Sequence, residues 1–475
     1  MADIRALEFF SGIGGLHFGF KASGATGEIL ESFDMNQQAN DTYKLSFGKS
    51  PVSRGIDRLT VRDIEKYNAN CWLMSPPCQP YTRGGKLLDD QDNRAKPLLH
   101  LLDQLEKMTT PPTYLFLENV KNFETSRSRE RMVKLLHKMG YVFRECLLAP
   151  HNFGVPNDRL RYFLMAKLRS SFEDPILRTS SPTTAVKSGD SLELFDPENE
   201  IIYTTWPFPA FVEDPKRPIK QHPFKLPELR YFLDHNETQK KDCLLPRQLI
   251  LERPNFRFDI LRPESDRSSC FTKAYGSHHV ASGGGLLQTL KMDQVEHDFE
   301  DSESIAELGL RFFSPTEVAR LHVFPLKDQR ELEDAFEIIG RENSTSTSQE
   351  TLTAIRPFNP RLAQGPNDPY LQFPEKLKAL QRYKLLGNSL NVWVVAELLR
   401  GVLFAGHTGK PLPEYRKFKD GAAQSPEATK SAESSSSTKH GIEDQARPVT
   451  AIDNADDGTS GADGVIRDTK RLKAE

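Results

Sequence analysis

The sequence predicts an α/β fold: a doubly wound, mainly parallel sheet, a smaller second domain and a disordered C-terminal tail. From residue 1 to about 170, strand-like apolar runs alternate with helical patterns, which is typical of parallel sheets. From about residue 173 to 304 this alternation gives way to frequent prolines and short periodic segments. After about residue 420 there is no aromatic residue, so the tail has too little apolar surface to fold.

Each element of the first domain follows from its local pattern. Short apolar runs bounded by turn residues predict strands, and apolar residues three and four positions apart predict helices. A further short strand is expected just before Gly55, where the sequence GID begins. The predicted strands are 5–10, 28–34, 71–75, 113–120, 141–149 and 159–168, and the predicted helices are 16–22, 37–47, 96–108 and 127–139.

The first domain is expected to consist of two separate segments. Residues 1–172 carry the alternating elements, and residues 305–409 add a helix over about Val392–Leu403, after a Gly-Asn-Ser turn. Residues 173–304 would then form the second domain. The polar stretch 327–369 is expected to be a surface insertion, and 410–475 the disordered tail.

Composition argues against several classes of protein. The five cysteines are odd in number and form no CxxC pair, which favours a reducing intracellular compartment over a disulfide framework. Cys243, Cys270, His278 and His279 fit no zinc-binding spacing, so no metal is expected. No apolar run reaches the 18 or so residues that span a bilayer. With a net charge of −3, any contact with nucleic acid needs local basic patches.

A glycine-rich turn follows the first predicted strand. In the sequence FFSGIGG, residues Ser11, Gly12, Gly14 and Gly15 allow a tight bend and a close approach of backbone to a ligand. The turn is not GxGxxG and has no P-loop lysine, so phosphate binding is not favoured. A tight turn without any ligand is an equally good interpretation of this stretch alone.

An acidic residue ends the second predicted strand. Asp34 stands where a carboxylate can bind both hydroxyls of a ribose, or it could cap the helix that follows. The glycine turn about twenty residues earlier favours the ribose. Ile56 could then pack on a purine, and Asp57 could accept its amino group.

Two reactive side chains follow the next strands. Pro76 and Pro77 fix the backbone just before Cys78, which is less easily explained as a buried structural cysteine than Cys71 or Cys146. Glu118 follows four apolar residues, so it could be a desolvated carboxyl group that takes up a proton, or a surface glutamate.

Two arginines complete the set. Arg159 and Arg161 lie on one face of a predicted strand, an unfavourable arrangement unless an anion lies opposite. In α/β sheets, ligands bind at the carboxyl ends of the strands, so these groups are expected in one crevice beside a nucleoside-bearing cofactor. A thiol and an acid there suit attack on an electron-poor heterocycle, which then takes an electrophile from the cofactor.

These motifs resemble those of a known family. FFSGIGG, MSPPCQPYTR, LENV, NDRLR and LLGNSLNV stand in the order found in S-adenosylmethionine-dependent cytosine-5 methyltransferases. The segment Ser268–Thr289 resembles the Cys-Phe-Thr segment of the tRNA-aspartate methyltransferase branch. The resemblance covers about 4–168 and 268–402. It implies a Rossmann-like methyltransferase domain at 1–172 and 305–409 and a target-recognition domain at 173–304.

The resemblance also implies a role for each matching residue. Cys78 would attack carbon 6 of cytosine, Glu118 would contact ring nitrogen 3 and the amino group, and Arg159 and Arg161 would steady the substrate. The implied cofactor site is Ser11, Gly12, Ile13, Gly14, Gly15, Asp34, Ile56, Asp57, Asn388 and Ser389. The substrate contacts expected are Arg83, Lys86, Lys121, Cys270, Phe271 and Thr272. The basic segment Lys121–Lys138 could equally be a solvated helix face.

The resemblance implies methylation of cytosine 38 in the anticodon loop of tRNA-Asp, by a monomer in the cytoplasm or in both cytoplasm and nucleus. A DNA cytosine-5 methyltransferase would share every catalytic residue. The third alternative is a catalytically silent paralogue that only binds nucleic acid. Selection would not maintain all of the catalytic residues in such a protein, and this sequence has them all. Asn157 stands where the wider family usually has glutamine, although asparagine is normal in the tRNA branch.

Overall fold

The structure is a computed structural model that describes residues 3–82, 88–168, 202–204, 226–234, 241–277, 283–327 and 368–404. The predicted tail 410–475 lies outside these residues, as does 328–367 of the predicted insertion. Much of the predicted second domain between 169 and 240 lies outside them as well.

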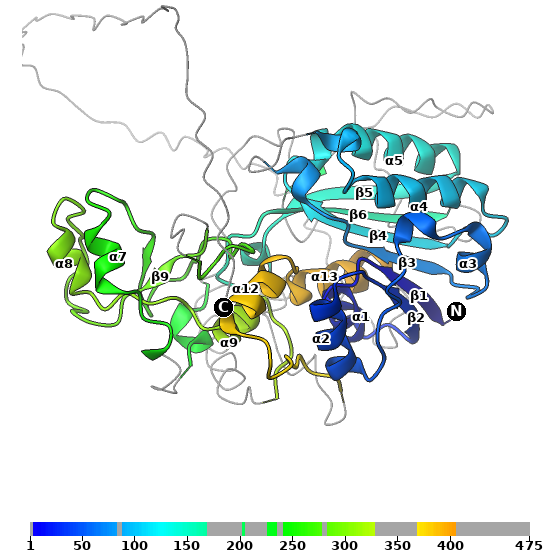
Figure 1. Cartoon of the computed structure of the whole chain (residues 1–475). Coiled ribbons are helices and arrows are strands. Elements are labelled where there is room, and N and C mark those ends of the chain that lie inside the picture. The colour runs from blue at the N-terminus through cyan, green and yellow to red at the C-terminus, as the bar shows by residue number, and fades with distance from the viewer. Residues whose placement is uncertain are drawn as a thin grey trace, which may run out of the picture. The chain divides into compact units, whose positions relative to one another are not determined.

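A mainly parallel sheet forms the centre of the fold, which confirms the predicted fold class (Figure 1). Its strand order is β2-β1-β3-β4-β6-β5-β7. β6 runs antiparallel to both of its neighbours, whereas the other pairs are parallel. The strands are β1 (Ile4–Phe9), β2 (Gly27–Phe33), β3 (Cys71–Met74), β4 (Tyr114–Val120), β5 (Tyr141–Leu148), β6 (Arg161–Leu168) and β7 (Ile202–Tyr203).

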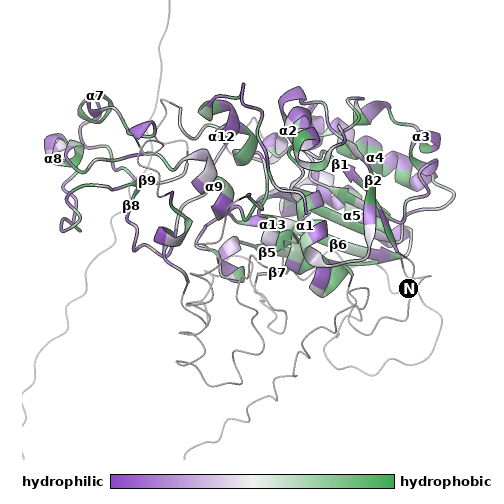
Figure 2. Cartoon of the chain, turned by 90° about the horizontal axis from the view of Figure 1, so that it is seen from below, coloured by the Kyte–Doolittle hydropathy of each residue, from purple (hydrophilic) through white to green (hydrophobic). Residues whose placement is uncertain are grey.

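Helices cover both faces of this sheet (Figure 1). Successive strand residues point to opposite faces, so Leu73 joins the hydrophobic cluster of one face and Trp72 that of the other. In Figure 2 the strands are largely hydrophobic where the helices cover them. One face carries α1 (Gly15–Ser23) and α13 (Val392–Leu398), and the other carries α3 (Val61–Glu65), α4 (Lys96–Lys107) and α5 (Arg127–Lys138).

The last helix joins the two distant segments of the chain. Asn391 caps α13 by accepting a hydrogen bond from the Val394 amide, and the helix continues as a π-helix over Leu399–Leu403. It packs on α1, where a Cβ atom on Gly19 would lie 2.5 Å from the Val395 side chain. The predicted return of residues 392–403 to the first part of the chain is therefore observed.

Two local predictions differ from the structure. The strand predicted before Gly55 is wrong, because this part of the chain makes only an isolated bridge between Phe33 and Val52. The helix α12 (Ala379–Gly387) precedes the Gly-Asn-Ser turn and was not predicted. Its partners, in the segment around α9 (Pro315–Leu321), lie far away in sequence, so local pattern gave little sign of it.

A small separate hydrophobic cluster, which includes Phe258 and Leu308, lies within the described part of 241–310. The boundaries of the predicted second domain stay predictions. The elements here are α7 (Arg247–Leu251), β8 (Ile260–Leu261), β9 (Leu286–Leu287) and α8 (Ser302–Ala306). Elsewhere the chain adds α2 (Gln37–Phe47) and short 3-10 helices at Ile56–Arg58, Gln79–Tyr81, Asp89–Gln91, Phe123–Thr125, Pro150–Phe153 and Leu229–Phe232.

Candidate active site

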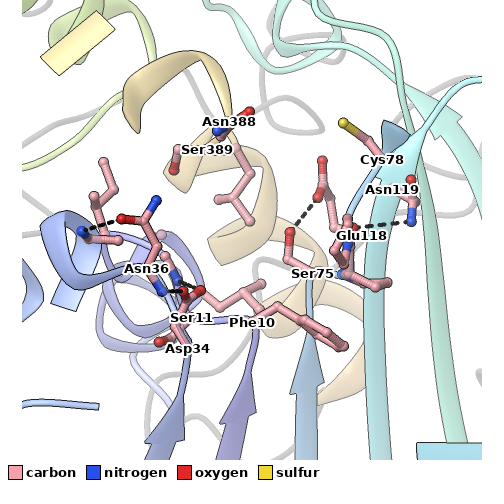
Figure 3. A pocket seen from close by; sticks show the side chains of 18 of the residues that line it. Phe10, Ser11, Asp34, Asn36, Ser75, Cys78, Glu118, Asn119, Asn388 and Ser389 are labelled. Atoms are coloured by element: carbon pink, nitrogen blue, oxygen red, sulfur yellow. Dashed lines mark hydrogen bonds between the residues drawn. The ribbon is translucent and has the colours of Figure 1, made fainter. Parts of the chain in front are cut away.

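A cavity of about 390 Å³ lies where β1, β3 and β4 end (Figure 3). Ligands of α/β sheets bind at this edge. The predicted catalytic residues Cys78, Glu118, Arg159 and Arg161 all line it. So do all the predicted cofactor residues except Gly14: Ser11, Gly12, Ile13, Gly15, Asp34, Ile56, Asp57, Asn388 and Ser389.

The glycine turn forms one wall of the cavity. Gly12 has a φ of 52°, and a Cβ atom there would meet no other atom within 4 Å. Gly14 precedes α1 with a φ of 87°, and a Cβ atom would lie 2.4 Å from the Phe47 ring, so this position needs glycine. Phe10 also has a positive φ, 59°, an uncommon conformation that clusters at functional sites.

Asp34 joins the glycine turn to the start of α2. Its carboxylate accepts hydrogen bonds from the amides of Gly12 at 2.9 Å and Asn36 at 2.8 Å. Asn36, not Asp34, caps α2, because its side chain accepts from the amides of Gln38 and Ala39. The helix-cap alternative for Asp34 is therefore wrong. Burial raises the pKa of Asp34 above its ordinary value, against the lowering effect of these backbone donors.

Apolar side chains lie beside this carboxylate. Ile56 is buried and lines the cavity, whereas Asp57 at the next position is exposed. Met35 also lines the cavity with 69% of its surface exposed, although sequence reasoning did not single it out. Its position directly after Asp34 is the one feature of the sequence that could have indicated that Met35 belongs to the site. A thioether is polarizable and packs well on aromatic rings.

These residues fit a nucleoside-bearing cofactor. A carboxylate for hydroxyl groups, apolar side chains for a flat base and an open glycine turn meet on one side of the cavity. The Ser11 hydroxyl also lines the cavity, is buried and has no hydrogen-bond partner among the described residues. A buried polar atom of this kind usually has a partner, which a bound ligand would supply.

Cys78 lies across the cavity, in the turn after β3. Burial raises the pKa of its thiol above the ordinary value. Arg161 opposes this shift, Glu118 adds to it, and Arg159 and Lys273 oppose it. The thiol is therefore surrounded by cationic groups that stabilise a thiolate once it forms.

Glu118 is buried at the end of β4, with 6% of its surface exposed. The Ser75 hydroxyl donates to its Oε2 atom at 2.8 Å, and Nε of Arg161 lies 3.5 Å from its Oε1 atom. Glu118 is thus the anion that the pair of arginines requires. Its burial excludes the alternative interpretation of Glu118 as a surface glutamate.

Arg159 holds together segments that lie far apart in sequence. Its guanidinium group donates to the carbonyl oxygens of Phe271 at 3.0 Å, Gly387 at 3.1 Å and Ser389. It also donates to Sγ of Cys270 at 3.4 Å. Burial acts to raise the pKa of Cys270, but the charges of Arg159 and its neighbour Arg161 lower it below its ordinary value.

The predicted substrate residues are less uniformly placed. Arg83 and Lys86 lie outside the described residues, and Lys121 is exposed directly after β4. The Phe271 side chain is buried against Phe313 and Tyr275 in the core, so only its carbonyl oxygen reaches the site, through Arg159. Thr272 is half-buried and accepts a hydrogen bond from the Ala274 amide.

Sequence reasoning missed two cations near Cys78. Lys273, exposed after the Cys-Phe-Thr segment, lowers the pKa of Cys78 by its charge. The charge of Cys78 acts in turn on Arg94, whose guanidinium group is held by the Asp92 carboxylate. Nothing in the local sequence distinguishes either residue from other surface cations.

Metal-binding clusters and membrane-spanning helices are both absent from the described residues. No three histidine, cysteine or acidic side chains are grouped there in a way that could hold a metal ion. None of the helices described has the length and apolar character needed to cross a membrane.

The chain is similar to known methyltransferases over most of its length. Its residues 4–403 match the family described as C-5 cytosine-specific DNA methylase. A tRNA (cytosine(38)-C(5))-methyltransferase of Mus musculus is 33% identical, across 84% of this chain and 93% of that protein. A DNA (cytosine-5)-methyltransferase of Dictyostelium discoideum is also 33% identical, across 84% and 94%.

A solved structure agrees with these sequence relatives. The crystal structure of a DNMT2 mutant from Spodoptera frugiperda is 29% identical, with a TM-score of 0.57. The match covers 85% of this chain and 100% of that one. The match over residues 4–403, together with these relatives, shows that the chain belongs to the C-5 cytosine-specific DNA methylase family of cytosine-5 methyltransferases.

Proposed function

We propose that this chain methylates carbon 5 of cytosine 38 in the anticodon loop of tRNA-Asp, with S-adenosylmethionine as the methyl donor. The observation that carries the proposal is the cavity itself, where Cys78, Glu118 and Arg161 face the glycine turn and Asp34. The RNA substrate is supported by relatives named tRNA (cytosine(38)-C(5))-methyltransferase in mammals, an insect and a yeast.

The glycine-turn side of the cavity would hold the cofactor. Asp34 would accept from the ribose hydroxyls, Ile56 and Met35 would pack against the adenine, and Ser11 would gain the hydrogen-bond partner it lacks. When bound, S-adenosylmethionine supplies an electrophilic methyl group. Asp34 must be ionised to accept hydrogen bonds from both hydroxyl groups. The amides of Gly12 and Asn36 donate to its carboxylate and so stabilise the ionised form that the cofactor needs.

The opposite side of the cavity would act on the base. The Cys78 thiolate forms a bond to carbon 6, and electron density moves onto ring nitrogen 3, where Glu118 donates a proton or hydrogen bond. Carbon 5 would thereby become nucleophilic and take the methyl group, while the bond between that methyl group and the cofactor's sulfur breaks and the cofactor leaves as a neutral thioether. A base then removes the proton from carbon 5, the Cys78–carbon 6 bond breaks, and the ring and the thiolate are restored.

Positive charge near Cys78 supports a polyanionic substrate. Lys273, Arg94, Arg159 and Arg161 all interact electrostatically with this thiol. Bases in an anticodon loop are already largely unstacked, so placing one in the cavity costs less than flipping a base out of a duplex.

The test is methyl transfer from labelled S-adenosylmethionine to a tRNA-Asp transcript, the same transcript with uridine at position 38, and duplex DNA. We expect label only in the first RNA, and none with Cys78→Ala. Label in DNA alone would instead support a DNA methyltransferase, the activity that the Dictyostelium relative's name describes. Binding of cofactor without any transfer would contradict the proposal.

The proposal extends to the state and place of the protein. It acts as a monomer in the cytoplasm, or in both cytoplasm and nucleus, where tRNA is found. Light scattering of the purified protein and immunoblots of cell fractions test these two statements. A dimer, or a location confined to mitochondria, would contradict them.

A further inference from the structure

We propose that Ser75 is a positioning residue for the methyl-transfer reaction: its hydroxyl group holds the Glu118 carboxyl group in the orientation that the cytosine ring requires. The inference rests on the proposed function, because the role of Glu118 comes from it. Ser75 lines the same cavity and was not among the residues expected from the sequence.

The contact arises from the way the β3–β4 ladder ends. The two strands pair in parallel up to Met74 and Leu117, so Ser75 and Glu118 are the next residues in register. Pro76 has no N–H group, so the backbone ladder cannot continue. Side chains take over the pairing (Figure 3): the Ser75 hydroxyl donates to Glu118, and the Asn119 amide group donates to the Pro76 carbonyl oxygen at 3.4 Å.

Glu118 needs such a partner because its last torsion is soft. Rotation about the bond to a carboxyl group has a broad energy profile, so packing alone does not fix the plane of the two oxygens. The plane matters here, since ring nitrogen 3 and the amino group of cytosine lie in one plane. Ser75 fixes Oε2 at 2.8 Å, while the Arg161 contact to Oε1 is longer, at 3.5 Å.

A hydroxyl group is suited to both protonation states of this acid. It can donate to a carboxylate oxygen, as in the contact with Oε2, and after a rotation it can accept from a protonated carboxyl group. A guanidinium group only donates, so Arg161 cannot accept a hydrogen bond from the O–H of a protonated Glu118. Ser75 therefore keeps Glu118 in place before and after a proton moves, which no other contact of Glu118 in the described residues provides.

The experiment compares kcat and KM for the tRNA-Asp transcript in wild type, Ser75→Ala and Ser75→Thr. We expect Ser75→Ala to lower kcat by about 10- to 100-fold, the cost of misplacing a general acid. The KM for RNA and the affinity for the cofactor should stay within about two-fold. Ser75→Thr keeps the hydroxyl group and should restore most of the rate.

A double-mutant cycle separates positioning from a general structural effect. If Ser75 acts through Glu118, Ser75→Ala should change kcat less than about two-fold in a Glu118→Gln background. Single-turnover assays with excess enzyme make these slow rates measurable. Ser23→Ala is the control, because it removes a buried hydroxyl that donates to the Phe20 carbonyl oxygen outside the cavity.

The results distinguish a failure of the proposed methyltransferase function from a failure of the proposed role of Ser75. If wild type transfers no methyl group to RNA, the proposed function fails first. If wild type is active, two results overturn the role of Ser75: an unchanged kcat in Ser75→Ala, or equal losses in both backgrounds. Should Ser75→Ala fail to bind the cofactor, Ser75→Cys replaces it, because a thiol is of similar size but a weak hydrogen-bond donor.

Discussion

At the scale of single residues, the proposed chemistry depends on how the charges around Cys78 offset the effect of burial on its thiol pKa. The thiol lies in a half-buried turn, where desolvation disfavours the thiolate. Arg161 provides the largest opposing effect, ahead of Arg159 and Lys273. Glu118 works against them, so Arg161 makes two interactions: it pairs with Glu118 and it favours the Cys78 thiolate.

The first prediction concerns the reactivity of Cys78. Arg161→Ala should move the midpoint of Cys78 alkylation to a higher pH, because the cation that lowers this pKa is lost. Mass spectrometry of iodoacetamide adducts across pH 6–11 measures the midpoint. Arg131→Ala, on the exposed side of α5, is the control. A midpoint that stays unchanged or falls would refute this account of the site.

At the scale of elements, a buried polar cluster joins β1, β2 and α2 beneath the glycine turn. Glu8 is fully buried and accepts hydrogen bonds from the Tyr43 hydroxyl at 2.9 Å, the Ser32 hydroxyl at 3.0 Å and the His17 amide at 3.1 Å. Burial raises the pKa of Glu8 to about 7, although these donors lower it. The nearby Asp34 charge raises it further.

The second prediction follows from this shift. Between the ordinary pKa of 4.5 and about 7, the folded chain keeps the Glu8 proton and the unfolded chain loses it. The free energy of unfolding should therefore fall as pH rises across this window, by at most about 3 kcal/mol from this group. Urea unfolding of wild type and Glu8→Gln at pH 5, 6, 7 and 8 measures it.

The neutral Glu8→Gln variant supplies the reference for this measurement. Its stability should lack the fall, so the difference between the two proteins should grow in its favour up to about pH 7 and then level off. Parallel pH profiles for the two proteins would show that Glu8 does not carry the effect.

A close contact between elements gives the third prediction. At the end of α12, a Cβ atom on Gly387 would lie 2.2 Å from the backbone of Thr272, and the Gly387 carbonyl oxygen accepts from Arg159. Gly387→Ala should lower the free energy of unfolding by about 1–3 kcal/mol and reduce methyl transfer as well, because the Cys-Phe-Thr segment must shift.

Gly140→Ala is the control for this substitution. Gly140 has a φ of 82° and open space around it, so alanine there costs about 1 kcal/mol from backbone strain. It should leave transfer unchanged, since Gly140 does not line the cavity. Full activity in Gly387→Ala would mean that the contact is not needed to form the site.

At the scale of the whole molecule, several cations lie close to Cys78 although the net charge of the chain is −3. A polyanion that binds there releases counterions in proportion to its phosphate contacts. Lys273 and Arg94 are both exposed, but Asp92 holds the Arg94 guanidinium group. Lys273 is therefore the better candidate for a phosphate contact whose loss leaves the cavity intact.

The fourth prediction tests this placement. Lys273→Gln should weaken tRNA binding by about 3- to 10-fold at moderate salt and reduce the slope of log affinity against log salt by about one. Fluorescence anisotropy at several salt concentrations gives both numbers. Lys107→Gln at the end of α4, away from the cavity lining, should change neither. An unchanged slope in Lys273→Gln would place the RNA backbone elsewhere.

Local sequence determined much of this molecule. Six of the seven strands of the main sheet were predicted within a few residues, as were α1, α2, α4, α5 and α13, because apolar periodicity and turn residues act over short distances. The short helix α3 was not predicted. The candidate site residues Cys78, Glu118 and Asp34 were also predicted from local sequence, because each lies at or just after the end of a strand. The rule that ligands bind at the carboxyl ends of the strands was enough to bring them together.

Tertiary structure alone decided the rest. β6 runs antiparallel, which places Arg161 at the start of its strand on the same edge as Glu118 at the end of another. Only the β3–β4 register sets Ser75 opposite Glu118. Phe271 packs in the core and leaves its carbonyl oxygen to Arg159. These contacts join residues far apart in sequence, so they depend on which packed arrangement of the whole chain has the lowest free energy. The secondary-structure propensity of a short segment does not determine that arrangement.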